Sequence, residues 1–251
     1  MREERSDQVG MGSESRASRP VEKEHTHSRR TVAGLALLLG LGSAVVFGVL
    51  GEEIQDSEPV AVDTGAAQFL HGYASAPLDT AMMLASFLGS AYFVIPLLAL
   101  VALLLLTRLR VAEAVFLSTA YAGSGALNYL LKLLFHRMRP SLPWSPGAPD
   151  FSFPSGHSMN SFTFYVGLAV VVWLVLGRRA GIAALAGGLL VVLLVGVSRV
   201  YLGYHYVSDV LGGYSAALLW LMVWAAAFSA IWRRFGTRLG GRFGARAPLS
   251  G

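Results

Sequence analysis

Long apolar runs alternate with short polar segments along most of this chain of 251 residues. A run of roughly 20 apolar residues is long enough to cross a bilayer as a helix. The pattern therefore predicts an all-α, polytopic membrane protein with six transmembrane helices. The predicted spans are residues 32–50, a stretch within 81–106, 111–134, 158–176, 182–197 and 210–232.

Two of these runs depart from an ideal span. The run within residues 81–106 is long for one straight helix, and Gly89 and Ser90 interrupt it, so we expect a tilt or a break there. The first run follows a polar segment of some thirty residues and is longer than the core of a signal peptide. It therefore predicts a helix that is retained in the mature protein.

Composition agrees with a membrane protein. Hydrophobic residues make up 54% of the chain and charged residues 14%, against roughly 25% charged residues in a soluble domain. The net charge is +5, but most basic residues flank apolar runs, which indicates membrane topology and no nucleic-acid partner. The chain contains no cysteine, which excludes disulfides and thiolate metal sites.

Arginine clusters predict the orientation. In a six-span chain they all fall on one side of the membrane, which the positive-inside rule makes cytoplasmic. The clusters are Arg29 and Arg30, Arg108 and Arg110, Arg178 and Arg179, and Arg233, Arg234 and Arg238. We therefore expect an integral protein of the cell (inner) membrane with both termini in the cytoplasm. Residues 1–30 are predicted to be a disordered tail, residues 31–233 the six-span domain and residues 234–251 a basic tail.

Two segments on the predicted outer side break this charge pattern. Residues 132–157 and 198–209 carry cations, and a Lys or Arg within the apolar layer costs on the order of 3 kcal/mol on insertion scales. Such groups usually mark a functional site. We interpret Lys132, Arg139 and Arg199 as members of a site, and Arg137 as an anchor at the membrane surface.

These three cations predict an anionic ligand. Beyond Glu113 the only carboxylic side chains are Asp150 and Asp209, so the segments hold no acidic surplus. Guanidinium groups match phosphate oxygens in a bidentate fork, and lysine adds a compact charge. The sequence therefore favours a phosphate ligand.

The motif "PSGH" (154–157) stands just before the fourth predicted span. A helix N-terminus offers unpaired N–H groups to an anion, and Gly156 lets the main chain approach a ligand closely. Ser155 is a candidate phosphate-binding residue, although a helix cap explains it equally well. His157 is a candidate proton donor for a leaving oxygen.

His205 and Asp209 stand four residues apart, so on a helix they would share one face. The carboxylate would accept the imidazole N–H and leave the other ring nitrogen free to attack phosphorus. The simpler alternative is that Asp209 only caps the sixth span. Because both histidines and all three cations fall on one predicted face of the membrane, a joint catalytic site is favoured.

The spacing of these residues resembles a known signature. Lys132 and Arg139-Pro140, then "PSGH" (154–157), then Ser198-Arg199, His205 and Asp209 are similar to the three-part motif of the type 2 phosphatidic acid phosphatase (lipid phosphate phosphatase) superfamily. No motif position departs from it. The resemblance covers about residues 63–232, with a motif-bearing core at about 111–215.

The resemblance implies a six-span lipid phosphatase with its active site at the extracytoplasmic face. It implies that His205 is a nucleophile that forms a phosphohistidine, that Asp209 orients it, and that His157 is the general acid. It assigns phosphate binding to Lys132, Arg139, Ser155, Gly156 and Arg199. No metal or other cofactor is implied, and the scarcity of carboxylates agrees because Mg²⁺ sites normally use such oxygen ligands.

The sequence leaves several functions open. The expected partners are a lipid phosphate substrate (a polyprenyl diphosphate, phosphatidylglycerol phosphate or phosphatidic acid) and membrane lipids. A phosphotransferase would use the same phosphohistidine with another acceptor, and a carrier of phosphorylated lipids would use the cations alone. A vanadium-dependent haloperoxidase shares the motif residues, but six apolar spans disfavour it. Head group, preference for mono- or diphosphates and oligomeric state do not follow from the sequence.

Overall fold

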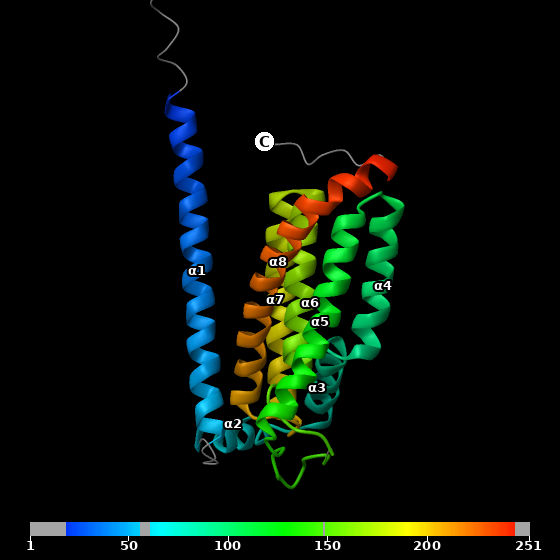
Figure 1. Cartoon of the computed structure of the whole chain (residues 1–251). Coiled ribbons are helices and arrows are strands. Elements are labelled where there is room, and N and C mark those ends of the chain that lie inside the picture. Colours follow the sequence, from blue (N-terminus) through cyan, green and yellow to red (C-terminus); the bar gives the residue numbers. More distant parts are fainter. Residues whose placement is uncertain (1–18, 56–60, 148, 244–251) are drawn as a thin grey trace, which may run out of the picture. The chain divides into compact units, whose positions relative to one another are not determined.

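The computed structural model describes residues 19–55, 61–147 and 149–243, and every regular element in these ranges is a helix (Figure 1). The prediction of an all-α chain is confirmed. The helices are α1 (Arg19–Gln55), α2 (Ala61–His71), α3 (Ala76–Leu88), α4 (Ala91–Thr107), α5 (Val111–Phe135), α6 (Gly156–Leu176), α7 (Arg178–Tyr201) and α8 (Val207–Phe243).

The chain forms two units, residues 1–41 and 42–251, and α1 runs from one into the other. Helix α1 begins at Arg19, before the predicted domain boundary at residue 31, and α8 continues to Phe243, beyond the predicted boundary at residue 233. Glu, Lys and Arg are good helix formers, so a helix can extend past its apolar run. The remaining parts of the two predicted tails, residues 1–18 and 244–251, lie outside the described residues.

Among the described residues, four helical segments are long and apolar enough to cross a membrane: Gly34–Gln55, Gly156–Leu176, Arg178–Tyr201 and Val207–Arg234. Helices α3 and α4 form a fifth candidate as a pair bent by 45°. The break lies at Gly89 and Ser90, as the sequence predicts. Helix α5 has the length of a span, but polar residues such as Asn128 lower its mean hydropathy.

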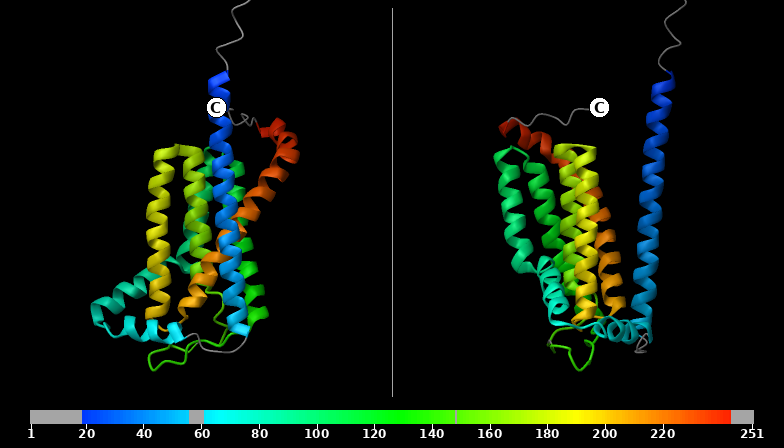
Figure 2. Two further views of the ribbon diagram at one scale, coloured as in Figure 1. Left: turned by 90° about the vertical axis from the view of Figure 1, so that its left-hand side faces the viewer. Right: turned by 180° about the vertical axis from the view of Figure 1, so that it is seen from behind.

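Helix α6 packs against α5, α7 and α8 within the unit 42–251 (Figure 2). Leu117 of α5 and Phe164 of α6 are fully buried between these helices. The indole N–H of Trp220 on α8 donates to the carbonyl of Ala120 on α5 over 2.8 Å. Outer faces expose large apolar side chains such as Leu103 and Leu190, which suits contact with lipid.

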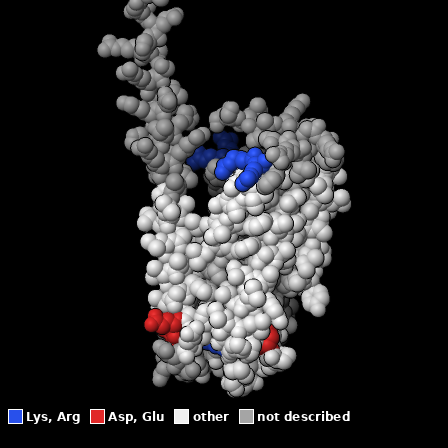
Figure 3. Space-filling view, in the orientation of Figure 1, with Lys and Arg blue, Asp and Glu red and all other residues white. Residues whose placement is uncertain are grey.

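One end of the unit 42–251 gathers the segments that carry the motifs. The loop between α5 and α6 and the turn between α7 and α8 lie there together with α2 (Figure 1). The sequence did not predict α2, which packs against α7 and α8 through the buried Ala67. On the face shown in Figure 3, Lys and Arg lie mainly at the opposite end, with a small patch at the motif end, where the Asp and Glu residues of this face lie.

Candidate active site

His205 and Asp209 meet, but not on one helix as predicted. His205 lies in the turn before α8, and Asp209 lies in the first turn of that helix. The Nδ1 atom of His205 is 3.3 Å from Oδ2 of Asp209, which also accepts the backbone N–H of Tyr206 over 2.9 Å. A carboxylate accepts only, so Nδ1 carries the proton and Nε2 is left with its lone pair. Asp209 therefore both caps α8 and orients the histidine.

The environment keeps the His205 ring neutral. The residue is 2% exposed, and burial lowers its pKa to about 4, outweighing the bond to Asp209, which raises it. Arg139 and Arg199 lower the pKa further by their charges. Its Nε2 atom lies 3.3 Å from the guanidinium Nη1 of Arg139. At neutral pH an unprotonated nitrogen therefore faces a cation that can hold a phosphate oxygen.

A cavity of about 360 Å³ is lined by His205 and Arg139. All of the predicted site residues line it except Ser155 and Asp209, which are fully buried behind it. The lining consists of Gly89, Ala91, Tyr121, Asn128, Tyr129, Lys132, Arg139, Asp150, Gly156, His157, Asn160, Arg199 and His205. The break between α3 and α4 thus contributes directly to the cavity through Gly89 and Ala91.

The cations are less free than the sequence suggests. Asp150 accepts hydrogen bonds from Lys132 Nζ over 2.5 Å and from Arg139 Nη2 over 2.6 Å. Although partial burial acts in the opposite direction, these bonds lower the pKa of Asp150 to about 2, so it is ionised at neutral pH. The sequence analysis counted Asp150 among the few carboxylates but did not predict that it pairs with two of the three cations. Three cations against one carboxylate still leave the cavity suited to an anion.

This geometry gives a prediction for Asp150→Asn. A bound phosphate must compete with Asp150 for Lys132 and Arg139, and the carboxylate is about half exposed, so each ion pair contributes up to about 1 kcal/mol. We expect the substitution to strengthen inhibition by inorganic phosphate roughly three- to ten-fold. Phosphate inhibition curves for the variant and the wild type measure this. A weaker inhibition in Asp150→Asn would show instead that Asp150 holds the cations in place for the ligand.

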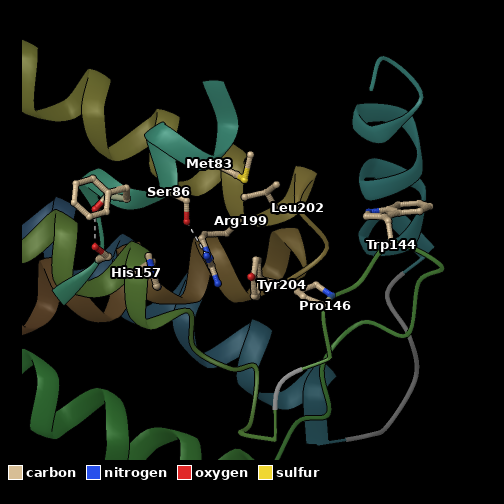
Figure 4. Close-up of a pocket in the computed structure, with 10 residues that line it drawn as sticks. Met83, Ser86, Trp144, Pro146, His157, Arg199, Leu202 and Tyr204 are labelled. Atoms are coloured by element: carbon tan, nitrogen blue, oxygen red, sulfur yellow. Dashed lines mark hydrogen bonds between the residues drawn. The ribbon is translucent and has the colours of Figure 1, made fainter. Parts of the chain in front are cut away.

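Arg199 is held by residues that no motif includes. Its guanidinium donates from Nη1 to the hydroxyl of Ser86 on α3 over 2.7 Å, and its Cζ lies 3.9 Å from the ring centre of Tyr204. Figure 4 shows Arg199 between His157 and Tyr204. Arg199 is 6% exposed, and its Nε has no partner among the described residues. A buried, unpaired N–H is costly, so this group is suited to a ligand oxygen.

The start of α6 brings three motif residues together. Ser155 caps the helix by accepting the backbone N–H of Ser158 over 3.4 Å. Gly156 lines the cavity, and a Cβ atom there would come within 2.9 Å of Oδ1 of Asn128. His157 lies in the first turn and lines the cavity described above. Ser155 therefore acts as a cap, while Gly156 and His157 face the place where an anion would bind.

Arg137 is not the surface anchor that the sequence suggested. Its side chain is 11% exposed and forms ion pairs with Asp209 over 2.6 Å and with Asp63 over 2.8 Å. Sequence reasoning missed Asp63 and Ser86 altogether. The one available signal was that Arg137 stands between Lys132 and Arg139, within a segment already rich in cations.

The chain is similar to known proteins in sequence and in fold. Residues 113–233 match the model of the PAP2 superfamily. Phosphatidylglycerophosphatase B of Bacillus subtilis (strain 168) is 34% identical over 137 residues, which cover 53% of this chain and 66% of that protein. Undecaprenyl-diphosphatase BcrC of the same organism is 32% identical over 106 residues, covering 40% of this chain and 50% of that protein.

The fold is also that of a solved relative. The crystal structure of a transmembrane PAP2-type phosphatidylglycerolphosphate phosphatase from Bacillus subtilis has 27% sequence identity and a TM-score of 0.70, covering 76% of this chain and 96% of that chain. The chain spans 66% and 50% of the lengths of the two sequence relatives just described. A third, putative undecaprenyl-diphosphatase YbjG of Escherichia coli (strain K12), is 33% identical over 150 residues, which cover 57% of this chain and 69% of that protein. The family match, the sequence relatives and the shared fold lead to one conclusion: this chain belongs to the PAP2 superfamily.

Proposed function

We propose that this protein is an integral-membrane lipid phosphatase that hydrolyses lipid phosphates or diphosphates without a metal, through a phosphohistidine at His205. The observation that carries the proposal is the placement of His205. Its Nε2 lies 3.3 Å from Arg139, which lines the same cavity as His205, while its Nδ1 is held by Asp209. A neutral, oriented imidazole beside a cluster of cations is suited to attack on phosphorus.

In the proposed complex, Lys132, Arg139 and Arg199 bind the oxygens of the substrate phosphate. The backbone at Gly156 and the positive end of the α6 dipole add to the attraction. The phosphate replaces Asp150 as the partner of Lys132 and Arg139. It also accepts a hydrogen bond from the Nε of Arg199, which has no partner among the described residues. These cations neutralise the charge that spreads over the phosphoryl oxygens in the transition state.

The first chemical step is an in-line transfer to His205. The Nε2 lone pair forms a bond to phosphorus while the bond from phosphorus to the lipid oxygen breaks, and His157 donates a proton to that leaving oxygen. Asp209 stabilises the positive charge that develops on the ring by accepting the Nδ1–H. His157 faces the cavity and, among the described residues, its ring has no hydrogen-bond partner, so it is available to the substrate.

The second step releases inorganic phosphate. A water molecule attacks phosphorus, the bond to Nε2 of His205 breaks, and His157 accepts the proton of that water. The enzyme returns to its starting protonation state after one water is consumed and one alcohol (or lipid monophosphate) and one phosphate are released.

We also propose six spans, with the site at the extracytoplasmic face and both termini in the cytoplasm. Six spans result if the bent pair α3 and α4 forms one span and α5 another. The basic turns at Arg108–Arg110 and Arg178–Arg179 lie at the opposite end from the cavity, which supports this orientation under the positive-inside rule (Figure 1).

A second cavity of about 360 Å³ supports sideways access of the lipid between helices. It shares His157 and Arg199 with the first cavity. Its other lining residues include the apolar Met83, Phe87 and Leu202 beside the polar Ser86, Ser90 and Tyr204. Figure 4 shows Met83 and Leu202 near Arg199. An acyl or prenyl chain placed there would bring its phosphate to the cations.

The proposal is tested by phosphate release from purified protein in detergent. The panel contains undecaprenyl diphosphate, phosphatidylglycerol phosphate, phosphatidic acid and diacylglycerol diphosphate, each with excess EDTA. We expect release from at least one lipid at an unchanged rate in EDTA. Release that disappears with EDTA and returns with Mg²⁺ would contradict the metal-free mechanism. Transfer of phosphate to added alcohols with no release to water would indicate a phosphotransferase.

A further inference from the structure

A chain of buried charges lies behind the proposed nucleophile. Arg137, in the loop after α5, donates from Nη1 to Oδ1 of Asp209 over 2.6 Å and from Nη2 to Oδ2 of Asp63 over 2.8 Å. The other oxygen of Asp209 faces His205. One guanidinium therefore joins two carboxylates, and one of these, Asp209, orients the proposed nucleophile.

Asp63 belongs to α2 and is 1% exposed. It accepts the backbone N–H of Ser208 over 2.9 Å and also the hydroxyl of that serine. Ser208 directly precedes Asp209, and its hydroxyl lies 2.7 Å from Nη1 of Arg137. Asp63 thus fixes both Arg137 and the first turn of α8 on which Asp209 stands.

The arrangement goes beyond what orienting a histidine requires. A histidine–carboxylate pair needs one carboxylate, yet here a buried cation and a second buried carboxylate from another helix are added. Buried charges are retained only where they are paired, and leaving one without its partner is costly. Asp63 also lies outside residues 113–233, which match the family model.

We propose that Arg137 and Asp63 are positioning residues for the phosphohistidine chemistry: together they set the orientation and the effective charge of the carboxylate that holds His205. This inference rests on the proposed function. Neither residue lines the cavity, so neither contacts the substrate phosphate. Arg137 partly neutralises the negative charge of Asp209, and Asp63 in turn partly neutralises the positive charge of Arg137.

Replacing Arg137 and replacing Asp63 should shift the protonation equilibrium of His205 in opposite directions. Without Arg137, two carboxylates are left uncompensated and a protonated His205 is favoured. Without Asp63, the positive charge of Arg137 is less balanced and a protonated His205 is disfavoured. The other charged groups around His205 stay the same in both variants. These are Asp209 on α8, Arg199 on α7, His157 on α6, Lys132 on α5, and Arg139 and Asp150 in the following loop.

The test compares Arg137→Gln and Asp63→Asn with the wild type on the best substrate of the panel. We expect kcat to fall about 10- to 100-fold in Arg137→Gln and less in Asp63→Asn, as for other residues that support a ligand-contacting group. KM should change little because the cavity lining is intact. Arg178→Gln, at the opposite end, is the matched control and should keep the wild-type kcat.

The pH dependence of kcat/KM in the two variants distinguishes an electrostatic effect on His205 from a purely structural one. The ratio of kcat/KM in the variant to that in the wild type cancels the ionisation of the substrate. From neutral pH down to about 4, the value to which burial lowers the pKa of His205, this ratio should fall for Arg137→Gln and rise for Asp63→Asn. Parallel changes in both variants, or a full wild-type kcat in either, would overturn the proposal.

Arg137→Lys provides a milder variant if Arg137→Gln does not fold. Lysine keeps the charge but cannot form the fork between two carboxylates. We therefore expect a reduced kcat and a ratio of kcat/KM, variant to wild type, that does not change with pH. A ratio that falls at low pH would overturn the proposal. A wild-type protein that releases no phosphate from any lipid would refute the proposed function itself, which this comparison of variants does not address.

Discussion

His205→Asn is expected to abolish phosphate release, with a loss on the order of 10⁴-fold or more. Asparagine has no lone pair on nitrogen that can attack phosphorus, so the phosphohistidine cannot form. Asp209 remains paired with Arg137, so the substitution leaves no carboxylate unpaired and the fold should persist. Steady-state release of inorganic phosphate from the best lipid substrate measures the loss, and the melting temperature in detergent reports folding.

His136→Asn is the matched control for this experiment. His136 lies close to the site in sequence and adopts a left-handed backbone conformation with φ of 48°, which asparagine tolerates well. Its ring packs against Phe151 and does not line the cavity. We expect activity close to that of the wild type. Substantial turnover in His205→Asn together with a normal melting temperature would exclude His205 as the nucleophile.

His157→Ala is expected to show a loss that depends on the leaving group. For lipid phosphates, whose alkoxide leaving group needs a proton, activity should fall roughly 10²- to 10⁴-fold. For p-nitrophenyl phosphate, whose leaving group is stable as an anion, the first step needs no acid and the loss should be much smaller. The two substrates are compared in His157→Ala and in the wild type, with initial rates in the same detergent.

The comparison of leaving groups distinguishes a general acid from a structural residue. His157 sits in the first turn of α6, and a local disturbance there would affect the binding of both phosphates equally. Equal losses in the single-turnover rate of the first step on the two substrates would therefore refute the role of general acid. Single-turnover measurements on p-nitrophenyl phosphate would show whether the remaining loss belongs to the second step, in which His157 is expected to activate water.

The sequence predicted six of the thirteen residues that line the cavity, because the chemistry of the site imposes residue types at fixed spacings. The predicted residues that line this one cavity are Lys132, Arg139, Gly156, His157, Arg199 and His205. Local rules also predicted the break between α3 and α4, because a Gly-Ser pair interrupts an apolar run too long for one helix. These features depend on residues that are neighbours in the sequence, or on the predicted placement of the motif segments at the same end of the spans.

The supporting contacts could not be predicted in this way. Asp63 and Arg137 are 74 positions apart, and Ser86 and Arg199 are 113 positions apart, so their pairing depends on how α2 and α3 pack against the rest. A lone acidic residue or serine at a predicted membrane surface carries no periodic signal. Asp150 was recognised as a scarce carboxylate, but its placement between two cations depends on the course of the loop.

The position of His205 shows how a correct pairing can arise from a different local structure. The spacing of four residues suggested a shared helical face, yet His205 precedes the helix and Asp209 reaches back from its first turn. The same carboxylate caps α8 through Tyr206, so the capping function and the catalytic function coincide. A spacing argument cannot separate these two geometries.

Trapping the phosphorylated enzyme tests the central claim most directly. Wild-type protein is mixed in EDTA with a lipid carrying a radioactive phosphate, quenched in alkaline detergent within the first turnover, and separated by electrophoresis. The account predicts label on the protein that survives alkali and is lost in acid, as a phosphoramidate bond requires, and no label on His205→Asn. Phosphate release at the full rate with no label on the wild-type protein at any quench time would contradict it, because water would then attack the lipid phosphate directly.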